Sequence, residues 1–329
     1  MTAKTRKKII KVVCIILAVI LVFIGAFFAF LKMGEIKLRE ELSYTDTELT
    51  DEDAYGDSAE VFYKGQGYVY NEDLINILFI GADKENIKEK KDRQADALYL
   101  ISLDTENNKV NIIAISRNTM ADIDVYDMNN EYFATDNVQI CLSYVYGKDD
   151  HHSAQLTSKA VSRLLYDIPI NSYGVLFTDS IVKIVDTVGG VQVTVPEDMT
   201  EVNANWKKGA KVVLHSNDAE TFIRYRKDEN QDRVERQMVF IKSFLNKAKS
   251  RMLKDWSLPV DLFKKVKNSV VTDIDASGIT YLATEASKSE ISYHTIKGTS
   301  GTDGLHETFT ADDEALYEMV LNLFYIKTK

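Results

Sequence analysis

A run of twenty residues without a charge, Val12–Leu31, constrains this chain more than any other feature. As a helix that rises about 1.5 Å per residue, the run would extend roughly 30 Å, the thickness of the hydrocarbon core of a bilayer. A buried helix of a soluble domain is a poor alternative, because no face of the run is polar. The run therefore predicts one transmembrane helix.

The charges on the two sides of this run differ in sign. The first acidic residue is Glu35, and the residues before it carry six positive charges: Lys4, Arg6, Lys7, Lys8, Lys11 and Lys32. The remaining 34 basic and 50 acidic residues give the rest of the chain a net charge of −16. A basic flank before a span predicts a cytoplasmic N-terminus, so we expect the rest of the chain outside the cytoplasm.

A cleaved signal peptide would also explain a basic flank before an apolar run. Its apolar core is usually shorter, and no small-x-small cleavage site follows this one, so we favour an uncleaved signal-anchor. Residues 35–60 carry ten acids and two bases, which indicates a solvated stalk. The expected organisation is a cytoplasmic basic tail (1–11), the signal-anchor (12–31), an acidic stalk (32–70) and an extracytoplasmic catalytic domain (71–329).

Three apolar runs predict the centre of a sheet. Ile75–Gly81, Ala97–Leu103 and Val110–Ser116 have the length and composition of buried strands, and the polar turn 104–109 makes the last two an antiparallel hairpin. The fold class expected is α/β, with a central mixed sheet and helices on both faces. Further strands are expected at 173–177, 191–195 and 292–297, and helices at 153–166, 179–188, 233–253, 259–266, 276–286 and 311–324.

Charged residues follow or precede these strands at one edge of the sheet. If the strands run up, down and up, Asp83 follows the first, Asp96 lies just before the second and Arg117 follows the third. Two carboxylates and an arginine that converge in this way suit a hard divalent cation beside an anion. Three ordinary residues at strand ends are the alternative.

Arginines form a second candidate site. The chain has ten arginines, and Arg224, Arg226, Arg233 and Arg236 fall within thirteen residues of an otherwise acidic domain. If the segment 222–226 is extended, Arg224 and Arg226 point the same way, and an anion between them would relieve their repulsion. The planar guanidinium matches phosphate oxygens, although a solvated basic face is the usual explanation of such a cluster.

A third candidate lies at the start of the helix expected over 233–253. Arg233 and Gln237 lie on one stripe of this helix beside its apolar positions, so its first turn would present polar groups toward the interior. A helix N-terminus already favours anions. Salt bridges at the helix start, for example between Arg236 and Glu229, are the alternative.

Other chemistries find little support in the sequence. Two cysteines and five histidines show no disulfide or zinc spacing, and no glycine-rich nucleotide motif is present. No serine has a placed histidine partner. An acidic domain is a poor partner for nucleic acid, so none is expected.

Seven segments, in order, resemble the LytR–CpsA–Psr (LCP) family. They are NILFIGAD (76–83), DALYLISLD (96–104), IAISRNT (113–119), LYDIPINSYG (165–174), VDTVGGVQV (185–193), FIRYR (222–226) and DRVERQ (232–237). The resemblance implies a transferase that moves an anionic glycopolymer, such as teichoic acid or capsule polysaccharide, from a polyprenyl-pyrophosphate carrier to a peptidoglycan hydroxyl during cell wall biogenesis. It also implies a bacterial cell membrane location, with the catalytic domain outside.

The resemblance also implies roles for single residues. Asp83 and Asp96 match the family's metal-linked aspartates, for Mg²⁺ or Mn²⁺. The arginines at the lipid pyrophosphate would be Arg117, Arg224 and Arg226, with Arg93 as a further candidate. Arg233 and Gln237 match the arginine and glutamine at the helix start, and most members carry a pocket for the lipid between sheet and helices.

The chain departs from the family pattern at two places that bear on the site. Gln94 stands where the family has an arginine, and Arg93 lies one residue early. Asn118 stands where the family has an aspartate after Arg117, which removes one negative charge there. Two alternatives to a transferase stay open: a hydrolase of the lipid pyrophosphate, and a non-catalytic lipid-binding protein of the envelope.

Overall fold

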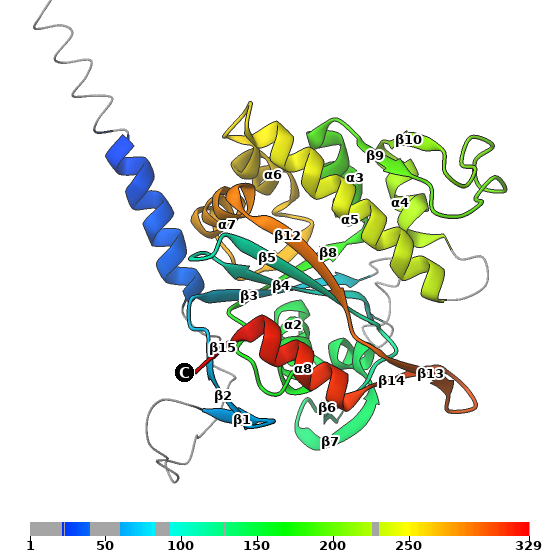
Figure 1. Ribbon diagram of the computed structural model, residues 1–329. Coiled ribbons are helices and arrows are strands. Elements are labelled where there is room, and N and C mark those ends of the chain that lie inside the picture. Colours follow the sequence, from blue (N-terminus) through cyan, green and yellow to red (C-terminus); the bar gives the residue numbers. More distant parts are fainter. Residues whose placement is uncertain are drawn as a thin grey trace, which may run out of the picture.

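The computed structural model describes residue 22 and residues 24–39, 60–82, 93–127, 129–225 and 230–328 (Figure 1). Its centre is a six-stranded mixed sheet in the order β11-β8-β3-β4-β5-β12. The bounds are β3 (Leu74–Ala82), β4 (Ala95–Asp104), β5 (Lys109–Ile115), β8 (Ser172–Phe177), β11 (Val270–Thr272) and β12 (Glu290–Thr295).

The strand pairing confirms the predicted centre of the sheet. β3 pairs antiparallel with β4, and β4 pairs antiparallel with β5 through the predicted polar turn. β8 and β12 pair in parallel with β3 and β5. Because helices cover both faces, β3 is buried almost throughout, which explains its continuous apolar sequence.

Helices cover the sheet on both faces, as the sequence predicts (Figure 1). One face carries α5 (Asn230–Met252), α6 (Leu258–Val266) and α7 (Ala276–Lys288). The other face carries α2 (Asp150–Leu164), α8 (Asp313–Phe324) and the 3₁₀ helix η2 (Ile140–Tyr146). Side chains of β3 and β4 alternate between the two cores, so that Leu78 and Leu100 face α2 and α8 while Ile77 and Leu103 face α7.

A smaller core lies beside the first. It contains α3 (Thr178–Val188), α4 (Ser216–Arg224), one side of α5, and the strand pair β9 (Val191–Thr194) and β10 (Lys211–Leu214). Trp206 packs edge-on against Phe222 at its centre, with ring centroids 5.7 Å apart. The remaining strands are β1 (Val61–Tyr63), β2 (Gln66–Tyr70), β6 (Met120–Tyr126), β7 (Tyr132–Gln139), β13 (Gly298–Thr302), β14 (Glu307–Ala311) and β15 (Tyr325–Lys327).

The N-terminal part is described from residue 24 as a helix over residues 24–39, drawn in blue in Figure 1. Among the residues that the structure describes, no helix is long and apolar enough to cross a membrane. Most of the predicted span 12–31 lies outside those residues, and so does most of the predicted stalk. β1 and β2 lie within the range 32–70 that the sequence assigns to the stalk. They pair with each other, and β2 also pairs with β15.

The β6–β7 hairpin is tied to α2 by a buried carboxylate. Asp124 on β6 accepts from Arg163 at 2.6 Å and forms an ion pair with Lys159 at 3.1 Å, both on α2. Burial opposes ionisation of Asp124, but the hydrogen bonds from Arg163 and Lys159 outweigh burial and hold its pKa below the usual value. This ion-pair cluster therefore joins β6 to α2 beside the apolar core that both elements share with the central sheet.

Asp124→Asn is expected to lower the free energy of unfolding by about 2–4 kcal/mol, because two partly buried cations would lose their carboxylate. The lowered pKa means that this stabilisation is present at neutral pH and is lost as the pH falls below about 4. Denaturant unfolding of both proteins between neutral and acidic pH tests this. The difference should shrink in acid; an equal difference at every pH would contradict the expectation.

Candidate active site

The end of the sheet brings Asp96 and Arg117 together, as the strand order predicts. Ala82 at the end of β3 is paired with Ala95 at the start of β4, and Leu98 is paired with Ile115 at the end of β5. Arg117 follows β5 and donates to the Asp96 carboxylate through Nη1. Both side chains keep about a fifth to a quarter of their surface exposed, at 21% and 25%.

Gln94 takes part in the same cluster. Arg117 donates through Nη2 to the amide oxygen of Gln94, so that one guanidinium holds both an acid and an amide. The departure at Gln94 therefore replaces a cation by an acceptor for Arg117. The fork geometry of arginine makes this double contact possible, and lysine could not reproduce it.

A buried thiol lies against this cluster, and the sequence analysis missed it. Cys141 on η2 has its sulfur 3.7 Å from Arg117 Nη2 and 3.9 Å from Gln94 Oε1. Burial raises the pKa of the Cys141 thiol, and the nearby Arg117 opposes that shift only in part. Cys141 is thus a protonated packing residue under the site. No sequence signal could place it, because it is 24 residues from Arg117 along the chain.

Of the two aspartates predicted to bind a metal, the structure describes only Asp96. Asp83 lies outside the described residues, and among those described no group of three histidine, cysteine, aspartate or glutamate side chains could hold a metal. The donors present do suit a hard cation, because Asp96 and Gln94 offer carboxylate and amide oxygens at one edge. Both oxygens already accept from Arg117, so a cation would share them with that arginine.

Arg93 pairs with an acid at the start of α2. Its Nη1 donates to Asp150 at the start of α2 at 2.5 Å, and its guanidinium carbon lies 6.0 Å from the centre of the Phe177 ring. The Nε of Arg93 is buried with no hydrogen-bond partner among the described residues. The structure thus places Arg93 beside the Phe177 end of β8, next to the strand end that carries the site.

Gln237 reaches the sheet from the other face. It is buried in the second turn of α5 and accepts a hydrogen bond of 2.9 Å from the Tyr99 hydroxyl on β4. The start of α5 therefore lies over the end of the sheet, as the polar stripe predicts. Arg233 also lies in this first part of α5, but the structure does not describe its side chain.

The segment 222–226 is not extended as the period-two argument assumed. Phe222–Arg224 form the last turn of α4, and the backbone leaves the helix at Tyr225. Arg224 donates to Glu220, one turn earlier, at 3.1 Å. A five-residue segment is too short for its sequence period to separate strand from helix. Arg226 lies outside the described residues.

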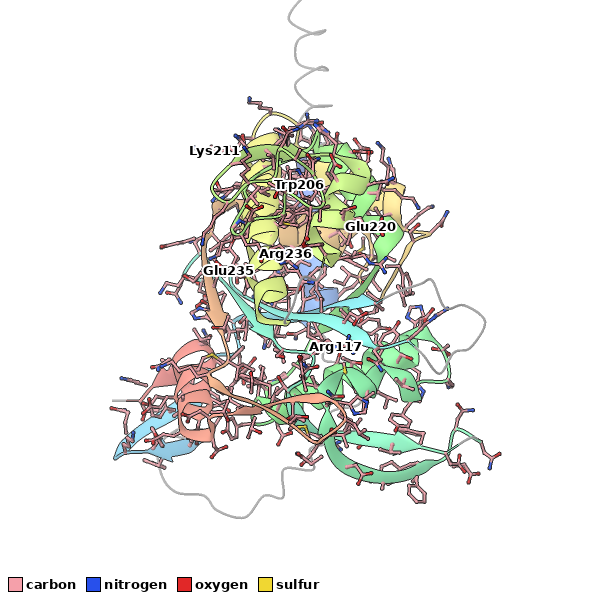
Figure 2. All side chains as sticks on the ribbon, turned by 90° about the vertical axis from the view of Figure 1, so that its right-hand side faces the viewer. Arg117, Trp206, Lys211, Glu220, Glu235 and Arg236 are labelled. Carbon is pink, nitrogen blue, oxygen red and sulfur yellow. The ribbon has the colours of Figure 1, made fainter. Side chains whose placement is uncertain are left out.

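Arg236, which the sequence analysis counted in the arginine cluster with a salt bridge to Glu229 as the alternative, is buried and pairs with a different acid. It is 1% exposed, pairs with Glu197 after β9, and donates to the backbone carbonyl of Tyr225. Its guanidinium carbon lies 5.4 Å from the centre of the Tyr225 ring, and burial lowers its pKa. Arg236 therefore joins the start of α5 to the residue between Arg224 and Arg226. In Figure 2 it lies above the strand ends, and Arg117 lies below them.

The structure accounts for Asn118. Its amide nitrogen donates to the Glu307 carboxylate on β14 at 3.2 Å, and its backbone N–H donates to the Ser116 hydroxyl. An aspartate at position 118 would set two carboxylates against each other, which costs free energy in a buried position. The amide at position 118 thus fits the acid that this chain carries at position 307.

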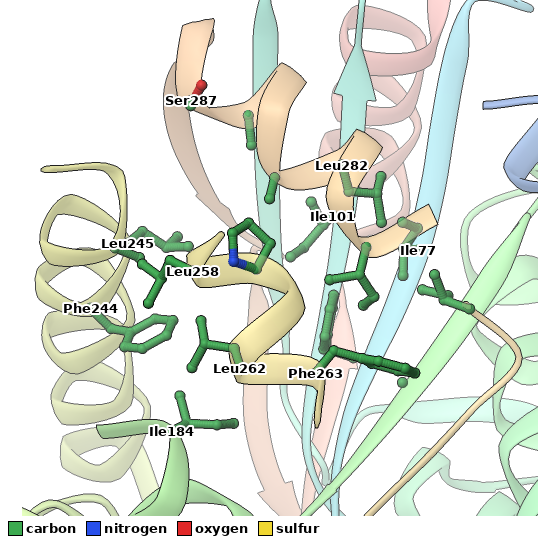
Figure 3. A pocket seen from close by; sticks show the side chains of 18 of the residues that line it. Ile77, Ile101, Ile184, Phe244, Leu245, Leu258, Leu262, Phe263, Leu282 and Ser287 are labelled. Carbon is green, nitrogen blue, oxygen red and sulfur yellow. The ribbon is translucent and has the colours of Figure 1, made fainter. Parts of the chain in front are cut away.

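A large apolar cavity lies between the sheet and the helices α5, α6 and α7 (Figure 3). Its volume is about 350 Å³, and its walls are almost entirely aliphatic and aromatic. Leu245, Leu262 and Leu282 come from the three helices, and Ile77 and Phe79 come from β3. Phe79 is paired with Tyr99, whose hydroxyl binds Gln237. The cavity therefore reaches the part of the sheet where the polar cluster begins.

The described residues thus combine a mixed α/β sheet, a cluster of Arg117, Asp96 and Gln94 at one end of that sheet, and an apolar cavity under the helices. The sequence profile of the LytR_cpsA_psr family matches residues 41–323. The chain belongs to this family.

Relatives of known name agree. A polyisoprenyl-teichoic acid–peptidoglycan teichoic acid transferase, TagU of Bacillus subtilis (strain 168), is 24% identical over 265 residues, which are 78% of each chain. The protein of the same name from Bacillus cereus (strain AH820) is 30% identical over 164 residues, which are 50% of this chain and 48% of that one.

Solved structures share the fold. TagV of Bacillus subtilis matches with a TM-score of 0.59 at 22% identity, over 76% of this chain and 95% of TagV. Protein gbs0355 of Streptococcus agalactiae matches with a TM-score of 0.63 at 21% identity, over 76% and 86%. A structure of TagT bound to LI-WTA matches with a TM-score of 0.60 at 18% identity, over 82% and 96%.

Proposed function

We propose that this protein transfers an anionic glycopolymer, of the teichoic acid class, from a polyprenyl-pyrophosphate carrier to a hydroxyl of peptidoglycan. The observation that supports it most is the link between an apolar cavity and a polar cluster: Phe79 of the cavity wall is paired with Tyr99, which binds Gln237. A polyprenyl pyrophosphate has the same two parts, an apolar chain and a compact anion. The names of the teichoic acid transferases among its relatives support the same substrate class.

In the proposed mechanism the protein binds charge and positions groups. Arg117, Arg224, Arg226 and Arg233 bind the pyrophosphate oxygens, and Gln237 orients the anion at the start of α5. The acceptor hydroxyl attacks the phosphorus that carries the sugar. The bond from that phosphorus to the lipid phosphate breaks, polyprenyl phosphate leaves, and the hydroxyl proton passes to solvent or to a nearby base. A divalent cation at Asp83 and Asp96 would neutralise the developing charge.

The same proposal places the protein on the outer side of the bacterial cell membrane. The basic tail, the apolar run Val12–Leu31 and the acidic remainder support a single signal-anchor with a cytoplasmic N-terminus. The lipid carrier and the peptidoglycan acceptor both lie on that side. A membrane anchor keeps the catalytic domain within reach of a substrate that does not leave the bilayer.

Incubation of the full chain with a lipid-linked glycopolymer, Mg²⁺ and peptidoglycan fragments tests the function. A transferase makes a covalent polymer–peptidoglycan product and releases polyprenyl phosphate. Release of free polymer without a covalent product would show a hydrolase. Binding of the lipid without turnover would show a non-catalytic envelope protein, and either of these results would contradict the proposal.

The four arginines proposed to bind the pyrophosphate, Arg117, Arg224, Arg226 and Arg233, are called the clamp here. Loss of one of them is expected to weaken lipid-pyrophosphate binding roughly 10- to 100-fold, because a charge-assisted contact is worth about 1.5–3 kcal/mol. Arg224→Ala and Arg226→Ala remove the positive charge. Arg226→Lys keeps the charge but removes the planar guanidinium that can bind two phosphate oxygens. Lys208→Ala, an exposed cation in the loop after β9, is the control. If the arginine variants bind within about twofold of the control, the arginines are surface charge and the clamp is wrong.

A further inference from the structure

The turn between α5 and α6 exposes large apolar side chains in an acidic domain. Leu253 is 79% exposed and Trp256 is 71% exposed. The residues on either side of them, Met252 and Leu258, line the apolar cavity. The turn is therefore a short apolar surface that borders the cavity directly, and water is a poor partner for it.

The N-terminal helix (residues 24–39) fixes where this turn lies relative to the predicted span. The helix is docked on α7: Leu38 is 2% exposed, Lys37 pairs with Asp275, and Gly34 lies so close to Ser277 that a Cβ atom would not fit. Its other end reaches the turn, because the Phe27 and Trp256 rings meet edge-on with centroids 5.7 Å apart.

The rise of the N-terminal helix gives the depth of Trp256 relative to the predicted span. Phe27 lies four residues before Leu31, the last residue of the predicted span. At about 1.5 Å per residue, Phe27 lies roughly 6 Å inside the outer edge of the predicted span. The Trp256 ring beside it lies at the same depth. Amphipathic segments at membrane surfaces bury their apolar side chains about 5–10 Å deep. Trp256 therefore lies at interfacial depth.

The charge around the turn also suits a contact with a membrane surface. Residues 249–267 carry six basic and two acidic residues, although the chain after Leu31 is acidic overall. The basic residues are Lys249, Arg251, Lys254, Lys264, Lys265 and Lys267. Cations beside an exposed tryptophan match a bilayer surface, where indole rings lie at the headgroup level and lysines reach anionic phosphates.

We propose that the α5–α6 turn is a second membrane contact, which inserts Leu253 and Trp256 into the bilayer surface beside the N-terminal helix and holds the apolar cavity at the lipid. The proposal rests on the proposed function, because it assumes the anchor and a lipid-linked substrate. It adds a reason for the position of the cavity: a polyprenyl chain can pass between bilayer and protein along the turn without crossing water.

The two tryptophans of the chain make a direct test possible. Trp206 is 3% exposed in the core of α3 and α4, whereas Trp256 is at the proposed contact. The full chain is reconstituted into vesicles of phosphatidylcholine and phosphatidylglycerol whose acyl chains are brominated near the carbonyl end or near the methyl end. Because two tryptophans share the emission, quenching of Trp256 alone should remove up to about half of it. Quenching should be stronger from the carbonyl end.

Two variants make the result specific. Trp256→Phe keeps an aromatic ring and should lose the quenching. In that background, Leu305→Trp places an indole at an 87% exposed site between β13 and β14, on another side of the molecule, and should not be quenched (Figure 1). If brominated lipids quench the wild type no more than Trp256→Phe, or quench Leu305→Trp equally, the contact does not exist. This readout needs no turnover, so its failure leaves the transferase proposal to its own assay.

Discussion

Asp96→Ala is expected to reduce polymer transfer by two to three orders of magnitude. The carboxylate is held by Arg117 at the end of the sheet, so its loss removes an oxygen donor for a cation and also frees the arginine that should bind phosphate. Removing one preorganised group from a site that stabilises developing charge typically costs about 10²–10³ in rate. The measurement is product formation with lipid-linked polymer at saturating Mg²⁺.

Stability should change little, which separates this effect from unfolding. Asp96 and Arg117 are both partly exposed, and a pair of that kind contributes only about 0–1 kcal/mol. Asp136→Ala, which removes an exposed carboxylate on β7, is the matched control and should keep full activity. Asp96→Asn should retain some activity at a higher Mg²⁺ requirement. Normal transfer by Asp96→Ala would show that the ion pair is structural only.

Ala283→Phe is expected to weaken binding of the polyprenyl chain by roughly 30- to 100-fold. Ala283 lies on α7 and lines the cavity, so a phenyl ring would occupy space that the lipid needs. Displacing about 100 Å² of buried apolar contact costs about 2.5 kcal/mol at ~25 cal/mol per Å². The measurement is the affinity of the full chain for a polyprenyl pyrophosphate in detergent solution.

Filling the cavity should not harm the fold. A ring that occupies empty apolar space gains contacts, so the unfolding temperature should stay equal or rise slightly. Ala204→Phe, in the exposed loop between β9 and β10, adds the same ring outside the cavity and should bind lipid normally. Unchanged affinity in Ala283→Phe would mean that the lipid chain does not enter this cavity.

Local patterns in the sequence were enough to predict the main strands and helices. The apolar runs of β3, β4 and β5, together with the polar turn 104–109, determine the antiparallel centre of the sheet, because pairing across a short turn needs no distant contact. The same strand order brings Asp96 and Arg117 to one edge. The long helix α5 and the position of Gln237 follow from a regular apolar stripe.

Only the tertiary structure decided the surroundings of these residues. The sequence counted Arg236 in a cluster of arginines, with Glu229 as an alternative partner, but Glu197 and the Tyr225 carbonyl, 39 and 11 residues away, hold it in the interior. Asn118 is explained by Glu307, which is 189 residues away. The cavity has no sequence signature either, because apolar residues that fill a core and apolar residues that line an empty space look the same along the chain. Periodicity and short turns therefore determined which segments form strands and helices, whereas distant contacts decided which charges are buried and where space for a ligand remains.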